Sequence, residues 1–352
     1  MREVRNATQT EWDGWLESSP GGGHIFQSYE WGEFKRTRGW RPVRLVLQRG
    51  DKVVGLGQFL AYNTAPVPGT LWYCTKGPWL PWDDEQAVRT FFEGVRSVAA
   101  CEGAHTVKIE PEVVEQQTRV KDLIWEIGFR KFRWDLNAKT DMVVELSLPE
   151  EDLLANMRRT TRYNIRLAAR KGVRIVEDNS FEAREHFLHM VKITGERNGF
   201  AMRRPDDYFL ALWRTLREAG SMYLFFAEHE GDRLAAMLLY ASGRKYWPWN
   251  ASTNEKRNLK PTELLQWEVM RWAKRRGLTC CNMGGIPNPK NLDNESDPWY
   301  SLYRFKSGFG GEIMDTIGCL DLAVNPVRAK LWNRIEPMYY RLYMRLKRDI
   351  YY

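Results

Sequence analysis

The strongest constraint on the fold of this chain is an internal duplication of a mixed helix-and-strand unit. In each half, two runs of β-favouring residues are joined by a Gly-Asp turn, which begins at Gly50 in the first half and at Gly231 in the second. Two such runs joined by a short glycine-containing turn predict a β-hairpin. The two turn glycines are 181 residues apart. Each half of the chain is therefore predicted to contain a hairpin.

The segments that follow the hairpins repeat as well. Residues 85–100 and 261–276 carry apolar side chains at helical spacing, and each segment is followed by a glycine and then by a β-rich run. A glycine directly after the last helical turn is a common stop signal. These glycines, Gly103 and Gly277, are 174 residues apart. Similar internal spacing in the two halves predicts two tandem α+β units.

The boundary between the two units is predicted near residue 147. A β-rich stretch ends there, and Ser147, Pro149 and Glu150 have the residue types of a helix N-cap, first turn and third helical position. The new helix is predicted to continue through a basic stretch to Gly172. The predicted parts are a first domain over 1–147, a second over 148–325 and a basic, aromatic helical tail over 326–352 that is broken or kinked at Pro337.

The composition is basic and rich in aromatic residues. Among 352 residues there are 53 Lys and Arg against 45 Asp and Glu, which gives a net charge of +8, and 13% of the residues are aromatic. A content of 43% hydrophobic and 28% charged residues is that of a packed globular chain and excludes disordered and fibrous classes. The basic charge suits polyanionic or sugar-bearing partners, and the composition equally suits a Trp-rich core under a charged coat.

The cysteines and histidines favour neither a disulfide framework nor a metal site. The five cysteines are odd in number and include no Cys-x-x-Cys pair. His186 and His189 are one helical turn apart but have no nearby cysteine or paired acid to complete a metal site. No apolar run approaches the roughly 20 residues that span a bilayer, and the N-terminus lacks a signal-peptide pattern. We therefore expect a reduced, cytoplasmic protein without bound metal.

Phosphate-binding loops of the common types are absent from the sequence. The segment Lys-Val-Val-Gly-Leu-Gly at 52–57 superficially resembles the pyrophosphate loop of the GNAT acetyltransferases, but it lies within the second arm of a predicted hairpin. Since a phosphate loop presents backbone N–H groups at a helix N-terminus, we interpret this segment as strand and disfavour a CoA-dependent reaction. Residues 284–289 follow a predicted strand and suit an anion site and a structural turn equally well.

Short blocks with distinctive residues are spread along nearly the whole chain. They are Tyr-Glu-Trp-Gly-Glu-Phe-Lys at 29–35, Val-Lys-Ile-Glu-Pro at 107–111, a basic segment at 157–173, Pro-Trp-Asn-Ala-Ser at 248–252, Pro261, Met-Gly-Gly-Ile at 283–286 and Tyr-Arg-Phe-Lys-Ser-Gly-Phe-Gly at 303–310. In this order they resemble the Fem-type (FemX/FemAB) peptidyltransferases, which are tRNA-dependent aminoacyltransferases that build the cross-bridges of peptidoglycan. The basic segment is the most specific of the blocks.

The resemblance implies an α+β fold of two tandem GNAT-like (acyl-CoA N-acyltransferase-like) domains. This agrees with the duplication and with the missing CoA loop. Members of the family with a coiled-coil arm carry a long helical insertion in the second domain. Between Asn179 and Asp206 there is no room for such an insertion, so the chain resembles the arm-less kind.

The resemblance also implies an acceptor site. Lys35 and Arg204 match positions that hold the diphosphate of a UDP-linked or lipid-linked muropeptide, and Tyr208, one helical turn after Arg204, matches an aromatic residue of the same site. Glu110 matches an acidic residue near the acceptor peptide, which either takes up a proton or binds the ammonium. Trp249 occupies a substrate-site position that is usually tyrosine in the family.

The donor site follows from the same resemblance. Lys306, preceded by Phe305, matches the lysine expected beside the aminoacyl ester, where a cation would stabilise the tetrahedral oxyanion. Arg158, Arg159 and Arg162 belong to the basic segment, for which we favour contact with the tRNA backbone over contact with a membrane or a solvated face.

The implied reaction moves an amino acid from aminoacyl-tRNA to the side-chain amine of the third residue of the stem peptide. Aminoacyl-tRNA is then a co-substrate, and no cofactor is expected, because the ester is already activated. Two alternatives stay open: an aminoacyl-tRNA-dependent transferase that acts on a protein N-terminus or a small metabolite, and a non-catalytic tRNA- or membrane-binding protein. We expect a monomer.

The tail over 326–352 raises the question of membrane contact. It carries seven cations and two acids, a net charge of +5, with aromatic and aliphatic residues between them. A basic, aromatic helix of this kind suits the anionic inner surface of a membrane. It suits equally a helix that docks on the domain and directs its cations outward.

Overall fold

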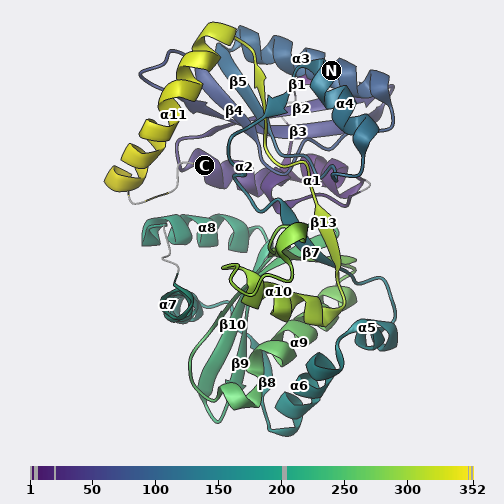
Figure 1. The fold of residues 1–352 in the computed structure, drawn as a ribbon, viewed down its shortest axis with the longest axis vertical. Coiled ribbons are helices and arrows are strands. Elements are labelled where there is room, and N and C mark those ends of the chain that lie inside the picture. Colours follow the sequence, from purple (N-terminus) through teal and green to yellow (C-terminus); the bar gives the residue numbers. More distant parts are fainter. Residues whose placement is uncertain (1, 4–6, 20, 200–203, 348, 350–351) are drawn as a thin grey trace. The chain divides into compact units, whose positions relative to one another are not determined.

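A computed structural model of the chain describes residues 2–3, 7–19, 21–199, 204–347, 349 and 352. The chain divides into two units, each with its own sheet and apolar core (Figure 1). Unit 1 comprises Met1–Lys139, Arg204–Leu216 and Asp315–Tyr352, and unit 2 comprises Thr140–Arg203 and Arg217–Met314.

The sheet of unit 1 contains seven described strands in the order β1-β2-β3-β4-β5-β14-β6. Strands β4 and β5 pair in parallel, and the other neighbouring pairs are antiparallel. The strands are β1 (Arg2–Glu3), β2 (Arg41–Arg49), β3 (Lys52–Asn63), β4 (Thr70–Cys74), β5 (Ala104–Ile109), β6 (Arg130–Lys131) and β14 (Leu320–Ala323).

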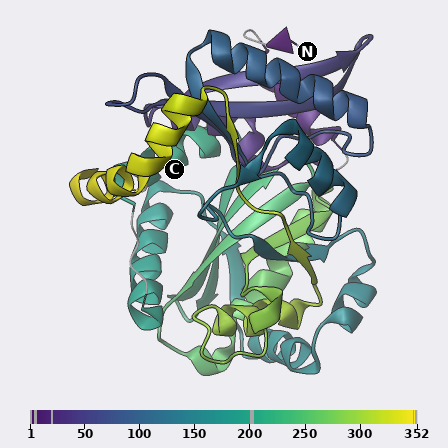
Figure 2. The ribbon, with the colours of Figure 1, turned by 45° about the horizontal axis from the view of Figure 1, so that its top comes forward.

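Helices cover this sheet and connect its strands. The helices of unit 1 are α1 (Gln9–Glu17), α2 (Tyr29–Arg36), α3 (Glu85–Cys101), α4 (Thr118–Ile127), most of α8 (Asp206–Glu218) and α11 (Pro326–Lys347), with a short 3₁₀ turn η1 (Ile25–Gln27) before α2. Helix α3 packs against β2 and β5 and lies along one face of the sheet in both ribbon views (Figures 1 and 2).

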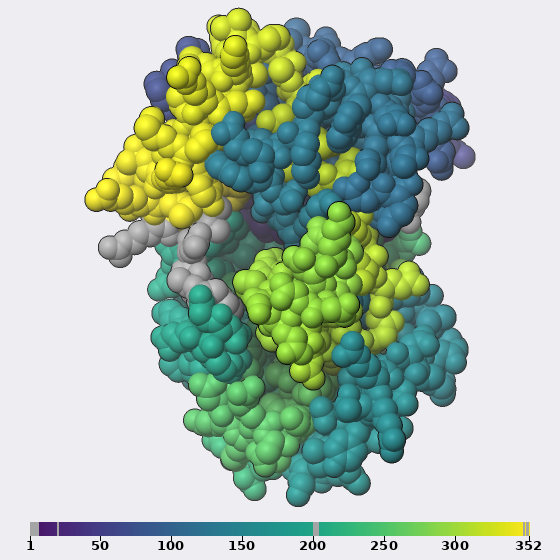
Figure 3. Space-filling model, viewed as in Figure 1, coloured from purple at the N-terminus to yellow at the C-terminus, as the bar shows by residue number. Residues whose placement is uncertain are grey.

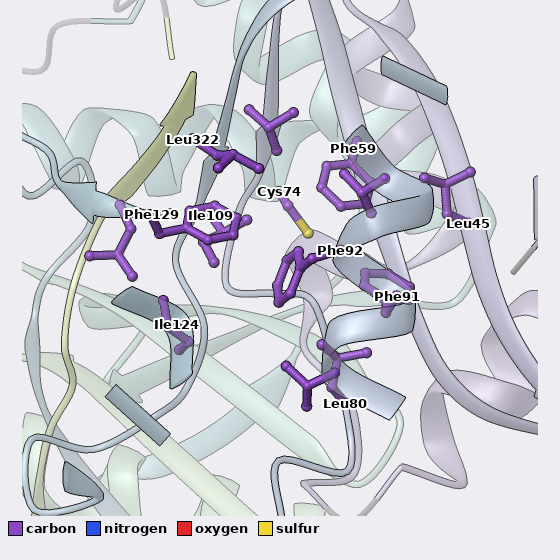
Figure 4. Packing of buried hydrophobic residues seen from close by; sticks show 14 of the residues in the cluster. Leu45, Phe59, Cys74, Leu80, Phe91, Phe92, Ile109, Ile124, Phe129 and Leu322 are labelled. Atoms are coloured by element: carbon purple, nitrogen blue, oxygen red, sulfur yellow. The ribbon is translucent and has the colours of Figure 1, made fainter. Parts of the chain in front are cut away.

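The apolar face of α3 supplies much of the core of unit 1. Phe91 and Phe92 are fully buried, and their rings lie 5.6 Å apart in an edge-on arrangement. Figure 4 shows them beside Phe59 of β3, and Leu322 of β14 belongs to the same cluster. Burial of each phenylalanine contributes roughly 2–3 kcal/mol, so strands far apart in sequence are held together by this helix.

The sheet of unit 2 contains seven described strands in the order β13-β7-β12-β11-β10-β9-β8. Strands β11 and β12 are parallel, and their ladder consists of two residue pairs, Lys245 with Cys280 and Tyr246 with Cys281. The strands are β7 (Thr140–Glu145), β8 (Arg174–Glu177), β9 (Met222–His229), β10 (Asp232–Ser242), β11 (Lys245–Ser252), β12 (Cys280–Gly285) and β13 (Glu312–Asp315).

The helices of unit 2 include the basic segment singled out in the sequence. They are α5 (Glu150–Asn156), α6 (Arg159–Arg170), α7 (Phe181–Asn198), α9 (Pro261–Arg275) and α10 (Tyr300–Lys306), with 3₁₀ turns η2 (Arg257–Leu259), η3 (Pro289–Asn291) and η4 (Ser307–Phe309). Most of the interval predicted to lack an arm, from Asn179 to Asp206, is occupied by α7, which ends at Asn198 before α8 begins at Asp206; residues 200–203 lie outside the described part of the chain.

The predicted duplication is confirmed. The hairpin β2–β3 turns at Gly50 and the hairpin β9–β10 turns at Gly231, and both glycines have positive φ angles, +59° and +86°. In unit 1 the hairpin leads through β4 to α3 and β5, and in unit 2 it leads through β11 to α9 and β12. The segment interpreted as strand rather than phosphate loop lies inside β3.

The division into units differs from the boundaries predicted from the sequence. Strand β7, assigned to the first domain, pairs with β12 in the sheet of unit 2, and β14, assigned to the second domain, pairs with β5 in the sheet of unit 1. Residues 204–216 of α8 also belong to unit 1. These memberships depend on strand and helix partners that are distant in sequence, which local patterns do not encode.

The long helix predicted from residue 147 to Gly172 is wrong, because two helices replace it. Helix α5 ends at Asn156, and Met157 is buried in an extended conformation before α6 begins. The backbone N–H of Arg158 donates instead to the carbonyl oxygen of Gly308, 2.9 Å away. The sequence predicts a tail that is broken or kinked at Pro337. The structure shows no break there, since α11 continues through Pro337.

Candidate active-site residues

Three cations of unit 1, which we call the cation cluster, lie close enough to affect one another electrostatically: Lys35 on α2, Arg38 just after it, and Arg204 before α8. The guanidinium carbons of Arg38 and Arg204 lie 5.7 Å and 4.3 Å from the ring centroid of Tyr208. Phe34 of α2 meets the same ring edge-on at 5.0 Å. The structure therefore places Arg204 against the ring of Tyr208, and Lys35 close to Arg204.

Lys35 is a buried cation. Its side chain is 5% exposed, and its Nζ atom lies 5.1 Å from the ring centroid of Trp40. Within the described part of the chain, no hydrogen bond or ion pair to this atom is found. Burial, together with the charges of Arg204 and Arg38, lowers the pKa of Lys35 to about 7, against an opposing effect of Asp349. An anion bound here would restore the charge of the lysine.

The anionic group that faces the cation cluster comes from the chain itself. The carboxylate of Asp349 is buried and accepts hydrogen bonds from Arg204 at 2.9 Å and from Arg38 at 3.2 Å. A second donor of Arg204 reaches the main-chain oxygen of Tyr352 at 2.8 Å. Arg38 also pairs with the exposed Asp207 at 2.8 Å. The sequence did not indicate Arg38 or Asp349, because nothing in the local pattern places the tail beside α2.

The block at 29–35 is shaped by the close approach of α2 to strand β3. A Cβ atom at Gly32 would overlap the Oε1 atom of Gln58. That oxygen accepts a hydrogen bond from Nε of Arg44 at 2.9 Å, and Ser28 caps the helix by accepting from the N–H of Trp31 at 3.2 Å. Glycine at this position lets the helix lie low on the sheet and fixes where Lys35 sits.

Glu110 is a buried carboxylate at the end of β5. One oxygen accepts from the backbone N–H groups of Leu136 and Asn137, both at 3.2 Å. The other accepts from the hydroxyl of Tyr73 at 2.6 Å and the side-chain amide of Asn137 at 2.5 Å. Burial and the Glu110 charge raise the pKa of Tyr73, so this hydroxyl stays a donor. Four donors thus hold the carboxylate in one orientation.

Lys306 lies at the end of α10 in unit 2, against the end of β12. Its Nζ atom donates to the carbonyl oxygen of Gly285 at 2.6 Å. Burial lowers the pKa of Lys306 to about 8, and the charge of Asp141 opposes this shift. Asp141 is itself buried on β7 and pairs with Gly285 across the strand ladder. Lys306 therefore remains mostly protonated at neutral pH.

A hydrogen-bonded chain links Asp141 to the strand end that holds Lys306. The amide of Asn282 donates to Asp141 at 3.2 Å, and its oxygen accepts from the N–H of Gly284 at 2.8 Å. Gly284 has a φ of +77°, and a Cβ atom there would lie 3.8 Å from Nζ of Lys306. The Gly-Gly pair at 284–285 is thus a turn whose Gly285 carbonyl oxygen accepts the hydrogen bond from Lys306. Asp141 and Asn282 were not indicated by the sequence.

The block at 303–310 packs directly on the basic segment. A Cβ atom at Gly308 would lie 2.5 Å from the hydroxyl oxygen of Thr161, and one at Gly310 would lie 2.6 Å from the carbonyl oxygen of Asn156. These contacts require glycine at both positions. The two blocks therefore form one packing unit, and α10, with Lys306 at its end, is anchored to α5 and α6.

A cavity of 540 Å³ opens beside Phe305 in unit 2. It is lined by the ends of α7 and β11, the loop after β11 and the start of α9. Three cations are among its lining residues: Arg197, Arg257 and Lys260. Phe305 also lines it, with its ring 5.2 Å from that of Phe309. A cavity of this size accommodates a small organic group.

Trp249 is half-buried on β11. Its ring lies edge-on to Phe187 of α7 at 5.2 Å. The next residue, Asn250, lines the cavity, and successive residues of a strand face opposite sides of the sheet. Trp249 therefore directs its ring to the other face of the sheet from Asn250.

The three arginines predicted to contact tRNA divide into two groups. Arg158 and Arg159 are exposed. Arg162 is half-buried, and one of its nitrogens donates to the carbonyl oxygens of Leu154, Ala155 and Met157 at 3.1, 2.9 and 2.6 Å. It thus satisfies the open end of α5. A count of charges in the sequence does not distinguish this bound arginine from the exposed ones.

Comparison with known proteins adds to these geometric findings. Residues 7–145 match the FemAB family, and residues 155–299 match an acetyltransferase (GNAT) domain. The chain is 24% identical to "Lipid II:glycine glycyltransferase" of Staphylococcus aureus (strain MRSA252) over 423 aligned positions, which cover 99% of each chain. The protein of the same name from strain USA300 is 25% identical over the same extent.

Solved structures agree on the fold. The crystal structure of FemX superposes with a TM-score of 0.85 at 24% identity, covering 95% of this chain and 100% of that chain. The L-PGS structure from Bacillus licheniformis gives a TM-score of 0.52 at 15% identity, covering 93% of this chain and 96% of that chain.

Two mixed sheets with these matches define an acyltransferase of tandem GNAT-like fold with a C-terminal helix, as the sequence predicts. Within that class, residues 7–145 carry the FemAB match and the chain aligns end to end with the glycyltransferases, so it is similar to the Fem-type peptidyltransferases.

Proposed function

We propose that this enzyme transfers an amino acid from aminoacyl-tRNA to the side-chain amine of the third stem-peptide residue of a peptidoglycan precursor, and so builds the cross-bridge. The observation that carries the proposal is Lys306, a cation held 2.6 Å from Gly285 and adjacent in sequence to the cavity-lining Phe305. The end-to-end alignment with glycyltransferases whose name specifies Lipid II supports the acceptor class.

At the donor site, Lys306 supplies positive charge to the transition state. Attack of an amine on the aminoacyl ester creates a tetrahedral oxyanion, and a fixed ammonium lowers its energy. Collapse of this intermediate breaks the ester C–O bond, and the ribose oxygen of tRNA leaves as a hydroxyl after it takes up a proton. The cavity beside Phe305 suits the terminal nucleoside of tRNA, and Arg257 and Lys260 suit its phosphates. The exposed Arg158 and Arg159 extend the set of backbone contacts.

At the acceptor site, Lys35 and Arg204 bind the diphosphate of the muropeptide, with Arg38 as a third cation. A diphosphate diester carries two negative charges, whereas Asp349 offers one, so the substrate replaces this carboxylate when it binds. Tyr208 keeps both guanidinium groups in place through its ring.

Glu110 handles the acceptor amine. An amine attacks only after it loses a proton. A carboxylate of fixed orientation either accepts this proton or binds the ammonium until water takes up the proton. Trp249 is not among the described residues that line the cavity beside Phe305, so its assignment to the substrate site rests on the family resemblance alone. Aminoacyl-tRNA is a co-substrate, no further cofactor is required, and the reaction belongs in the cytoplasm, where charged tRNA is found. We propose that one chain suffices for it.

The test is a transfer assay with labelled amino acids on a mixture of charged tRNAs and two purified acceptors, a UDP-linked and a lipid-linked muropeptide. We expect transfer to at least one acceptor. We expect the lipid-linked form to be preferred, since the glycyltransferases that align with the whole chain are named for Lipid II. Absence of transfer to both and, in parallel reactions, to a protein N-terminus or a small metabolite, with tRNA still bound, would establish the non-catalytic alternative. Transfer only to a protein N-terminus or small metabolite would overturn the acceptor assignment.

A further inference from the structure

The outward side of α11 is apolar, although it faces solvent. Val327, Leu331, Met338, Leu342 and Leu346 are 79%, 48%, 68%, 53% and 70% exposed. At 3.6 residues per turn these positions fall on one side of the helix, which we call the outer face of α11. Figure 3 shows atoms of this helix, in yellow, at the surface of the molecule.

The outer face is bordered by positive charge. Lys330, Arg334, Arg341 and Arg345 are exposed beside the aliphatic residues. The acid of this helix, Glu336, is buried and interacts with Lys108 and with the hydroxyl of Tyr352. The exposed surface of α11 therefore combines aliphatic side chains with cations and carries no acid.

The opposite side of α11 attaches the helix to unit 1. Ala329, Trp332 and Glu336 are buried, and the ring of Trp332 lies 6.0 Å from that of His105 on β5. Because these residues hold the helix in place, the outer face contributes nothing to the core of the unit. Five exposed aliphatic side chains on one helix therefore call for a partner outside the unit.

We propose that the outer face of α11 docks on an anionic lipid bilayer surface, with its axis along the membrane plane. Aliphatic residues enter the boundary between headgroups and acyl chains, and the bordering cations contact lipid phosphates. Among the described residues no helix is long and apolar enough to cross a membrane, so docking is peripheral. The proposal rests on the proposed function in one respect, that a lipid-linked acceptor resides in that bilayer.

Two other occupants fit the outer face less well. A second copy of the chain would bring the cations of two such faces together without an intervening acid, which opposes association. RNA would suit the cations, but single-stranded RNA is bound by stacking on aromatic rings, and the exposed apolar residues of this face are aliphatic.

Vesicle co-sedimentation of the full chain tests the proposal. We expect binding to vesicles of phosphatidylcholine with phosphatidylglycerol and little binding to phosphatidylcholine alone. The double variant Leu342→Ser/Leu346→Ser should weaken binding at least about tenfold, because both side chains lose their contact with the apolar boundary. The double variant Arg334→Ala/Arg341→Ala should weaken vesicle binding by about fivefold per cation. At high salt this variant and the unaltered chain should bind vesicles equally.

Matched controls show whether an effect on vesicle binding is specific to the outer face of α11 or follows from any loss of exposed apolar or cationic residues. Leu148→Ser/Phe181→Ser removes two apolar residues that are 37% and 57% exposed elsewhere, and Arg119→Ala/Arg214→Ala removes two exposed cations from other helices. Both controls should bind vesicles as the unaltered chain does. All variants change exposed residues, so their thermal unfolding should match that of the unaltered chain.

The outcomes separate this inference from the proposed function. Outer-face variants should transfer to a UDP-linked acceptor in solution at the unaltered rate and lose transfer to a lipid-linked acceptor in vesicles. Equal vesicle binding by outer-face and control variants would overturn the docking proposal, as would an outer face that mediates dimerisation without lipid binding. Vesicle binding without transfer to any acceptor would leave docking supported and refute the proposed function.

Discussion

The carboxylate of Asp349 lies 2.9 Å from the guanidinium of Arg204, so a residue of the tail pairs with a cation that we propose binds the substrate diphosphate. Substitution Asp349→Asn should therefore strengthen binding of a UDP-linked muropeptide roughly tenfold, the equivalent of one charge-assisted hydrogen bond. Calorimetric titration measures this change. Asp207→Asn is the matched control, because this exposed acid pairs with Arg38 and should have a smaller effect. Unchanged affinity in Asp349→Asn would show that the diphosphate binds elsewhere.

The buried ammonium of Lys35 predicts that diphosphate binding depends on pH. Its pKa is about 7 in the unliganded protein, so the charge that attracts the diphosphate is present below that value and is lost above it. A diphosphate diester does not itself titrate near neutrality. Affinity should fall as the pH rises from 6 to 8, and Lys35→Met should weaken binding and abolish this dependence. An identical pH dependence in the variant would assign the titration to another group.

Substitution Lys306→Met should reduce aminoacyl transfer by about 100- to 1000-fold while the fold stays intact, since removal of one oxyanion donor has an effect of this size. Single-turnover transfer with preformed aminoacyl-tRNA measures the chemical step. Lys290→Met, which alters an exposed lysine of the same unit, should transfer normally. A rate near that of the unaltered enzyme in Lys306→Met would exclude the lysine from the chemistry.

The position of Asp141 makes a separate prediction about the pH profile of transfer. Lys306 acts as an ammonium, so the transfer rate at saturating acceptor should be constant below its pKa of about 8 and fall above it. Asp141→Asn removes the negative charge that opposes the effect of burial, and this lowers the pKa of Lys306. The alkaline limb of the profile should move to lower pH, and Asp152→Asn, an exposed change on α5, should leave it in place. If the alkaline limb does not move in Asp141→Asn, this aspartate has no effect on the charge of Lys306 and its role is structural.

Much of the fold could be predicted from the sequence because its signals are local. The turns at Gly50 and Gly231 need positive φ angles and fix two hairpins, and apolar spacing fixes α3 and α9. Strand membership was not predictable in the same way. Strand β14 is four residues long and enters the sheet of unit 1 because of its partner β5, which lies some two hundred positions earlier in the chain.

The candidate site shows the same division. The family resemblance indicated Lys35, Arg204 and Lys306, and the structure places the first two close to each other, with Arg204 over the ring of Tyr208. It did not indicate Asp349 or Asp141, whose relevance arises from contacts with segments far away in sequence. It also could not separate Arg162, whose donors satisfy the end of α5, from exposed arginines of the same helix.

The place of β14 between β5 and β6 also affects how the protein is synthesised. The sheet of unit 1 stays open at β5 until residues 320–323 have left the ribosome, by which time every residue of unit 2 has been made. Unit 2 can therefore finish folding first, although it lies later in the gene than most of unit 1. A nascent chain that stalls before residue 320 exposes the edge of β5, which makes it prone to aggregation.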